Sequence, residues 1–240
     1  MKLAILDAAT LGEGLDFGVL DRFGEVVRYE SSTPDEVRTR MADADILLIN
    51  KIKINADNLA AAKHLKLICI FATGYDNVDI AACRAAGVAV CNVKGYSTHS
   101  VAQLTVLMAL TLTEKLGAYT AAVTSGEYQK SGVANKLSPI YHELCGKTWG
   151  IVGAGAIGTQ VARVAEAVLS GKLGGFACDV YSTEPFGDAH PFAHLVGLDN
   201  VLLTPHMAWG ALEARVRCLD EVAKNIEAFF GGEIRCRVDL

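Results

Sequence analysis

The sequence lacks the features that mark several large classes of protein. Its seven cysteines form no C-x-x-C pair and their number is odd, so they predict reduced core thiols of a cytoplasmic protein, not a disulfide framework. No apolar run reaches the roughly 18 residues that a membrane span needs, and no signal peptide is visible after Met1. The net charge is −5 without a long basic run, so we expect neither nucleic acid nor a membrane as a partner.

What the sequence does contain is a large apolar fraction. Hydrophobic residues make up 51% of the 240 residues and charged residues 20%, which predicts a sizeable core and room for two small domains. Apolar runs alternate with helical runs through the first hundred residues, as in a parallel sheet covered by helices on both faces. Such sheets bind ligands at the carboxyl ends of their strands, and Asn50-Lys51 and Thr73-Gly74 follow two of the predicted strands.

A glycine-rich turn organises the second half of the chain. Residues 147–158 read KTWGIVGAGAIG, with a short apolar strand before the turn and a helical run after it. This order is typical of a dinucleotide fingerprint, in which glycines allow a tight turn and a close approach to the pyrophosphate at the helix N-terminus. The alternative is a glycine turn that binds nothing. The cofactor-binding candidates in the turn are Gly153, Gly155, Ala156, Ile157 and Gly158.

The remaining patterns suggest how the domains divide. The longest helical pattern covers residues 97–117, whereas residues 118–141 show no strong period and are predicted to be a loop or arm. A last helix is predicted over residues 211–230, ended by two glycines. We expect residues 1–97 and 211–240 to form the substrate domain and residues 98–210 to form the nucleotide domain.

Four blocks of the sequence carry a resemblance to a known family. They are residues 71–80 (FATGYDNVDI), 93–103 (VKGYSTHSVAQ), 144–158 with the glycine turn, and 170–185 (SGKLGGFACDVYSTEP) joined with 200–209 (NVLLTPHMAW). Together they resemble the D-isomer-specific 2-hydroxyacid dehydrogenases, and the block 93–103 is most similar to the glycerate dehydrogenase (hydroxypyruvate reductase) branch. The resemblance implies an α/β fold with a flavodoxin-like substrate domain and a Rossmann-type nucleotide domain.

The resemblance also implies an activity, hydride exchange between a nicotinamide cofactor and a 2-keto or D-2-hydroxy acid. His206 matches the proton donor, Glu184 the carboxylate that holds it, and Asp179 a contact to the nicotinamide. Thr73 and Gly74 match the loop whose main-chain N–H groups hold the substrate carboxylate. Hydroxypyruvate or glycerate is the expected substrate and NAD the expected cofactor, with NADP left open. No metal is implied, and a homodimer through the nucleotide domain is expected.

Each candidate side chain also has an ordinary structural explanation. His206 can donate to the backbone of a turn, Glu184 can be a solvated acid, and the Thr73 hydroxyl can bind a nearby carbonyl. Lys51, which follows the strand that faces the Thr73 loop, can be a surface charge instead of a substrate contact. Asp179 can cap a turn; it also lies 21 positions after Gly158, where the fingerprint expects its ribose-binding acid.

The nucleotide domain is shorter than the family pattern. Six strands are expected but only three are found, so roughly 80–90 residues are missing at about 30 per strand–helix unit, with a seam near residues 167–168. The missing part would carry the family's catalytic arginine. Either the given sequence omits residues of the molecule, or the deletion is real. The alternative functions are a catalytically impaired nucleotide-binding protein that acts through partners, and a dehydrogenase of another 2-hydroxy acid, such as phosphoglycerate.

Overall fold

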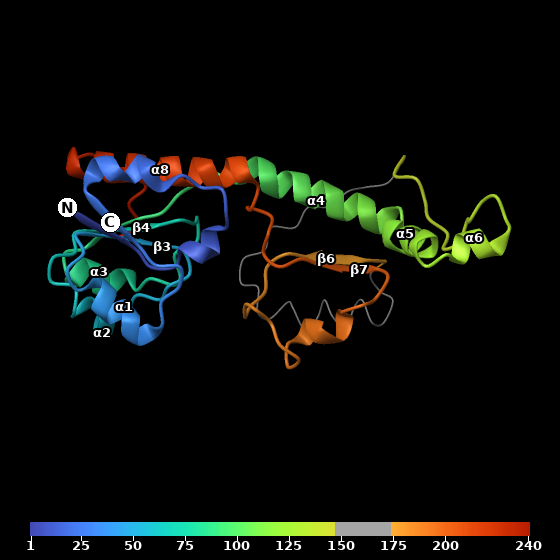
Figure 1. Ribbon diagram of the computed structural model, residues 1–240, viewed down its shortest axis with the longest axis horizontal. Helices are drawn as coiled ribbons and strands as arrows, with labels where there is room; N and C mark the ends of the chain where they lie inside the picture. Colours follow the sequence, from blue (N-terminus) through green and yellow to red (C-terminus); the bar gives the residue numbers. More distant parts are fainter. Residues whose placement is uncertain (147–173) are drawn as a thin grey trace. The chain divides into compact units, whose positions relative to one another are not determined.

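The structure is a computed structural model that describes residues 1–146 and 174–240 (Figure 1). These residues form two compact units, Met1–Ser100 with Trp209–Leu240, and Val101–Ala208. The assignment of substrate to the first unit and nucleotide to the second stays a prediction. The seam and the glycine turn lie outside the described residues, and with the turn lie Gly153, Gly155, Ala156, Ile157 and Gly158.

Five parallel strands form the sheet of the first unit, in the order β2-β1-β3-β4-β5. This is the flavodoxin-like order, and the predicted fold class is confirmed. All residues of the central strands β3 and β4 are buried, because helices cover both faces of the sheet. The strands are β1 (Lys2–Ile5), β2 (Glu25–Arg28), β3 (Ile46–Ile49), β4 (Leu67–Ile70) and β5 (Ala89–Cys91).

Helices on the two faces of this sheet bury two separate cores. Val37 and Met41 of α1 belong to one core, and Cys218 and Val222 of α8 belong to the other. Figure 1 shows α8 over one face and the three short helices α1, α2 and α3 over the opposite face. The helices are α1 (Pro34–Met41), α2 (Ala56–Leu59), α3 (Ile80–Ala85), α8 (Leu212–Phe230) and the 3-10 helices η1 (Ala8–Leu11) and η2 (Phe17–Phe23).

The C-terminal residues cover the outer edge of β5. Arg237 pairs antiparallel with Cys91, and the Val238 N–H donates to the Val90 carbonyl at 2.9 Å. The Asp239 carboxylate accepts the Val90 N–H at 2.9 Å and pairs with Arg237. Burial disfavours the charged form of Asp239, but the Arg237 guanidinium and the Val90 N–H outweigh it and lower its pKa.

The second unit contains a helical arm. The arm consists of α4 (Thr98–Thr113), α5 (Leu116–Thr124) and α6 (Glu127–Ser131). Of the two alternatives predicted for residues 118–141, a loop or an arm, the loop is therefore wrong over α5 and α6. The sequence of α5 shows no amphipathic period because only Ala122 of that helix is buried, so no apolar stripe marks a buried face.

A pair of parallel strands forms the rest of the described second unit. The strands β6 (Phe176–Cys178) and β7 (Val201–Leu203) pair in register, and the 3-10 helix η3 (Pro191–Leu195) packs against them. Both strands are only half-buried. Because strands run parallel, their carboxyl ends lie at one edge, which is where the predicted site residues follow.

The pKa of Asp239 predicts an acid-dependent loss of stability. A lowered pKa means that the folded state binds this proton less tightly than the unfolded chain, which titrates near about pH 4. The stabilisation is therefore present above about pH 4 and is lost as the pH falls through the lower, folded-state pKa. We expect Asp239→Asn to reduce the free energy of unfolding by about 1–2 kcal/mol at neutral pH and by less in acid. Urea denaturation between pH 3 and pH 7 measures the loss of unfolding free energy at neutral pH and in acid. An equal loss at every pH contradicts the lowered pKa of Asp239.

Candidate active site

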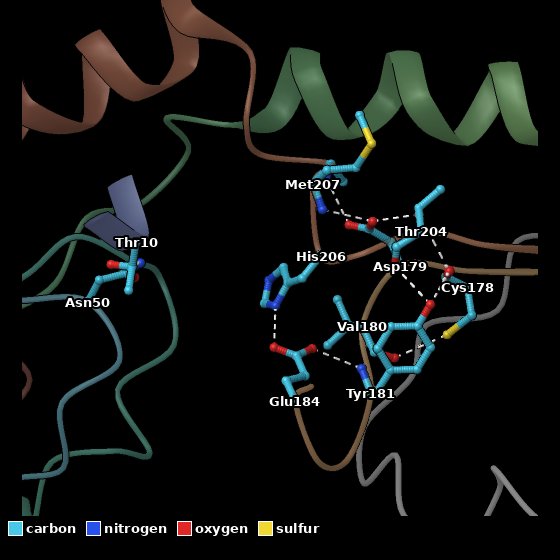
Figure 2. Close-up of polar contacts among 11 residues, drawn as sticks. Thr10, Asn50, Cys178, Asp179, Val180, Tyr181, Glu184, Thr204, His206 and Met207 are labelled. Carbon is cyan, nitrogen blue, oxygen red and sulfur yellow. Dashed lines mark hydrogen bonds and ion pairs between the residues drawn. The ribbon is translucent and has the colours of Figure 1, made fainter. Parts of the chain in front are cut away.

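An imidazole and a carboxylate meet at the carboxyl ends of β6 and β7. The Nδ1 atom of His206 lies 2.6 Å from Oε2 of Glu184, and both side chains are partly exposed (Figure 2). The second carboxylate oxygen of Glu184 accepts the main-chain N–H of Tyr181 at 2.9 Å. A carboxylate only accepts, so Nδ1 carries the proton, and Nε2 is then the ring nitrogen that can take up or release a proton.

The backbone of His206 is in the left-handed region, with φ 52°. This conformation is rare and unfavourable for a residue with a Cβ atom, so the surrounding contacts have to hold it. The Asp179 carboxylate does so by accepting the N–H groups of Met207 and Ala208, each at 2.8 Å. It also accepts the hydroxyl of Thr204 at 2.6 Å. One carboxylate from the end of β6 therefore holds the turn on both sides of His206.

The geometry of Asp179 matches the simplest explanation considered for it, that of a residue that caps a turn. Each of its oxygens accepts at least one hydrogen bond from residues 204–208. Its predicted contact to the nicotinamide stays a prediction, as does the ribose contact considered as an alternative. The contacts do show that Asp179 and His206 belong to one hydrogen-bonded turn.

Tyr181 is a member of this site to which sequence analysis gave no role. Its hydroxyl donates to the Thr204 carbonyl at 2.8 Å, with the Cys178 carbonyl at 3.2 Å as a second acceptor. The ring is buried and tilts against Phe186, at 4.6 Å between centroids. Burial raises the pKa of Tyr181 to about 12, so the hydroxyl remains a donor at neutral pH. The available signal was that a buried tyrosine needs a partner for its hydroxyl.

A cavity of about 450 Å³ lies beside the His206–Glu184 pair, called the dyad below, in the second unit. Most of its lining atoms are apolar, and the dyad supplies polar groups at its wall. A largely apolar hollow with a few polar groups is the usual form of a small-molecule site. The lining residues are Tyr181, Glu184, Pro185, Phe186, Val196, Leu203, Thr204, Pro205 and His206.

The predicted carboxylate loop follows β4 in the first unit. The Thr73 hydroxyl donates to the Val93 carbonyl at 2.7 Å, and the Thr73 carbonyl accepts the side-chain amide of Asn92, also at 2.7 Å. Within residues 1–146 and 174–240, the main-chain N–H groups of Thr73 and Gly74 have no acceptor. The hydroxyl of Thr73 is thus used locally, and the N–H groups are the part of this loop suited to an anion.

Lys51 follows β3 on a neighbouring loop, which two buried polar contacts hold. Asp7, only 3% exposed, accepts the N–H groups of Lys51 and Asn50 at 2.6 and 3.0 Å. Burial raises the pKa of Asp7, although these two N–H groups act against that rise. Asn77 donates to the Ile52 carbonyl at 2.8 Å and so joins this loop to the Thr73 loop. Asp7 was missed in the sequence; its signal was an acid directly after an apolar strand at a sheet's switch point.

No group of three or more His, Cys, Asp or Glu side chains suited to a metal ion occurs in the part of the chain that the structure describes. In that same part, no helix is both long and apolar enough to cross a bilayer.

Comparisons with known proteins give one consistent result. Residues 7–238 match the family model described as D-isomer specific 2-hydroxyacid dehydrogenase, catalytic domain. The chain is 27% identical to a glycerate dehydrogenase of Methylorubrum extorquens over 284 positions, which cover 87% of this chain and 90% of the relative. A solved D-lactate dehydrogenase from Aquifex aeolicus, complexed with NAD and lactic acid, has the same fold, with a TM-score of 0.76 at 19% identity, covering 97% of this chain and 96% of that one.

A second relative is longer than this chain. A hydroxypyruvate reductase of Blautia hydrogenotrophica is 24% identical over 317 positions, which cover 97% of this chain and 98% of the relative. Since this chain has 240 residues, at least 77 residues of the relative have no counterpart here. The coverage places most of these residues inside the matched region. Their number agrees with the shortfall of roughly 80–90 residues expected from the missing strands.

The hydrogen bonds of Asp179 predict where hydrogen exchange will change. In Asp179→Ala the amide of Met207 loses its acceptor. We expect this amide to exchange about tenfold faster or more, whereas the control Asp188→Ala, an exposed acid of the same unit, leaves it unchanged. Amide exchange followed by NMR measures the rate. Unaltered protection in Asp179→Ala means that another group holds the turn.

Proposed function

The chain belongs to the family of D-isomer-specific 2-hydroxyacid dehydrogenases, which are NAD(P)-dependent, and we propose that it interconverts hydroxypyruvate and D-glycerate. The observation that carries the proposal is the His206–Glu184 pair at the carboxyl edge of two parallel strands. Parallel α/β sheets bind dinucleotides and substrates at that edge. A glycerate dehydrogenase and a hydroxypyruvate reductase among the relatives support the choice of substrate.

His206 acts as the acid and base of the proposed reaction. During reduction, Nε2 gives a proton to the oxygen on C2 of the keto acid, and during oxidation it takes the proton back. Glu184 holds the Nδ1 proton and stabilises the charged ring that forms in the oxidation direction. The N–H groups of Thr73 and Gly74 bind the substrate carboxylate, and Lys51 adds positive charge at the neighbouring loop.

The described residues fit a nicotinamide cofactor. The dyad borders a largely apolar cavity of about 450 Å³, which suits a flat ring with one polar edge. When bound, the cofactor supplies a hydride to C2 of the keto acid or accepts one from the hydroxy acid. We propose NAD as the cofactor. NADP is left open, because the acid that selects between the two belongs to the predicted missing segment. The residues proposed to hold it are Gly153, Gly155, Ala156, Ile157, Gly158 and Asp179.

The gap of at least 77 residues favours a second candidate function, a catalytically impaired protein that binds the nucleotide and acts through partners. The family's catalytic arginine is expected within the gap. The arginines on α8 are poor substitutes, because Arg215 donates to the carbonyls of Gly210, Leu11 and Glu13, and Arg217 donates to that of Tyr96. A phosphoglycerate-like substrate is a weaker alternative, since a phosphate favours a larger cluster of basic side chains than the pair of Lys51 and Lys53 that the sequence offers after β3.

A substitution at the dyad tests the proposed reaction. We expect His206→Ala to lower the rate of NADH oxidation with hydroxypyruvate by about 100- to 10,000-fold, because the substrate oxygen loses its proton donor. The matched control is His194→Ala, which removes an imidazole from η3 outside the dyad. An unchanged rate in His206→Ala removes this residue from the mechanism. Binding of NADH seen by calorimetry, together with no turnover of any 2-keto acid by the unaltered chain, supports the impaired protein instead.

We further propose that the arm forms a homodimer with a second copy of the chain. Large apolar side chains are exposed along α4 and α5, among them Leu107 at 56% and Val123 at 51%. Among the 16 residues of α4, only Met108 is buried. Apolar exposure of this extent on consecutive helices is typical of a protein–protein interface.

The proposed dimer can be tested by placing a charge on the arm and measuring the mass of the particle in solution. We expect the unaltered chain to sediment as a dimer and Leu107→Glu to sediment as a monomer, because a carboxylate in an apolar interface loses its hydration. Ile234→Glu is the control, since Ile234 is 77% exposed and belongs to the first unit. Analytical ultracentrifugation distinguishes the two masses. A monomeric unaltered chain at micromolar concentration contradicts the proposal.

A further inference from the structure

Tyr181 makes one hydrogen bond toward each member of the dyad (Figure 2). Its main-chain N–H donates to Oε1 of Glu184 at 2.9 Å, while Oε2 of the same carboxylate lies against His206. Its hydroxyl donates to the Thr204 carbonyl at 2.8 Å. That carbonyl also accepts the main-chain N–H of His206 at 3.0 Å. A single residue therefore reaches the carboxylate directly and the imidazole through the carbonyl two residues before it.

These contacts matter because the two members of the dyad come from different loops. Glu184 follows β6 and His206 follows β7, and 22 positions separate them in the chain. Their 2.6 Å contact therefore requires that both loops are held in position relative to each other. The Asp179 carboxylate binds the turn on both sides of His206, through the N–H groups of Met207 and Ala208 and through the Thr204 hydroxyl. The hydroxyl of Tyr181 adds a second contact before His206, to the Thr204 carbonyl.

The surroundings of Tyr181 leave its hydroxyl one use, as a donor to a main-chain carbonyl. The side chain is 9% exposed, and its ring contacts Phe186, His190 and Phe192 on its sides. The hydroxyl has one proton and two carbonyl acceptors, those of Thr204 and Cys178, so no second donor function is left for a ligand. The ring is also part of the cavity wall next to the dyad.

We propose that Tyr181 is a positioning residue for the dyad, whose hydroxyl holds the Thr204 carbonyl and thereby keeps His206 Nδ1 against Glu184. The proposal rests on the function proposed above, because it assigns a role within the same site. In this role the hydroxyl of Tyr181 does not act on the reacting atoms. It acts on the tautomer and orientation of His206, and so decides whether Nε2 is available to the substrate oxygen.

Tyr181→Phe isolates the hydroxyl, because phenylalanine retains the ring and its packing. The matched control is Tyr128→Phe, which removes a hydroxyl that donates to the Ala134 carbonyl at 2.7 Å in the arm. Both variants lose one tyrosine-to-carbonyl hydrogen bond in the second unit. Each is prepared as the full 240-residue chain with ¹⁵N-labelled histidine, and His206→Ala identifies the His206 signals.

The first readout is the tautomer of His206 in long-range ¹H–¹⁵N NMR spectra, which requires no turnover. We expect the unaltered chain and Tyr128→Phe to show mainly the Nδ1–H form and Tyr181→Phe to shift toward Nε2–H, the form that free imidazole prefers. The second readout is steady-state kinetics. We expect kcat to fall about tenfold in Tyr181→Phe, the effect of one hydrogen bond, with KM changed less than twofold.

The outcomes separate this proposal from the function on which it rests. If Tyr181→Phe keeps both the tautomer and kcat of the unaltered chain, while His206→Ala loses turnover, the positioning role is refuted and the proposed function stands. If the tautomer shifts in Tyr181→Phe but the unaltered chain turns over no 2-keto acid, the positioning role holds and the proposed reaction fails. An equal loss in Tyr128→Phe also refutes the proposal, because the effect is then one of general stability.

Discussion

The described part of the second unit depends on the carboxylate of Asp179. It stands at the end of one strand and accepts three donors from the residues that follow the neighbouring strand. Its contacts help to offset the left-handed conformation of His206, which costs about 1–2 kcal/mol. His206 and Glu184 therefore become neighbours only when the hydrogen bonds of Asp179 connect the segment after β6 to the segment after β7.

The first unit uses the same device. Asp7 is buried at the end of β1 and accepts main-chain N–H groups from the loop after β3, and Asn77 donates to a carbonyl of the same loop. In both units a carboxylate at the carboxyl edge, buried in Asp7 and half-buried in Asp179, accepts main-chain N–H groups of a neighbouring loop, and that loop presents the candidate group. A buried carboxylate that accepts several N–H groups meets its hydrogen-bonding needs without a charged partner.

The fold of the first unit was predictable because its signals are local. Thr33 and Glu36 make the capping box that their spacing predicts, and short apolar runs become the parallel strands. The pairing of His206 with Glu184 was expected only through a family resemblance, since no local rule connects residues 22 positions apart. Asp7 and Tyr181 were missed for the same reason, because Asn50 and Lys51, which bind Asp7, and Thr204, which binds Tyr181, follow other strands. The helix over residues 97–117 was predicted and corresponds to α4, whereas α5 was missed because its exposed alanine and threonine residues leave no period to detect.

The first unit is discontinuous in sequence, and this affects how the chain is made. Residues of α8 such as Leu219, Val222 and Ile226 cover one face of a sheet whose strands all lie within the first hundred residues. On the ribosome, that face stays open to water until the residues of α8 emerge. The sheet therefore exposes apolar surface until the second unit has been synthesised, and it completes its fold only after that point.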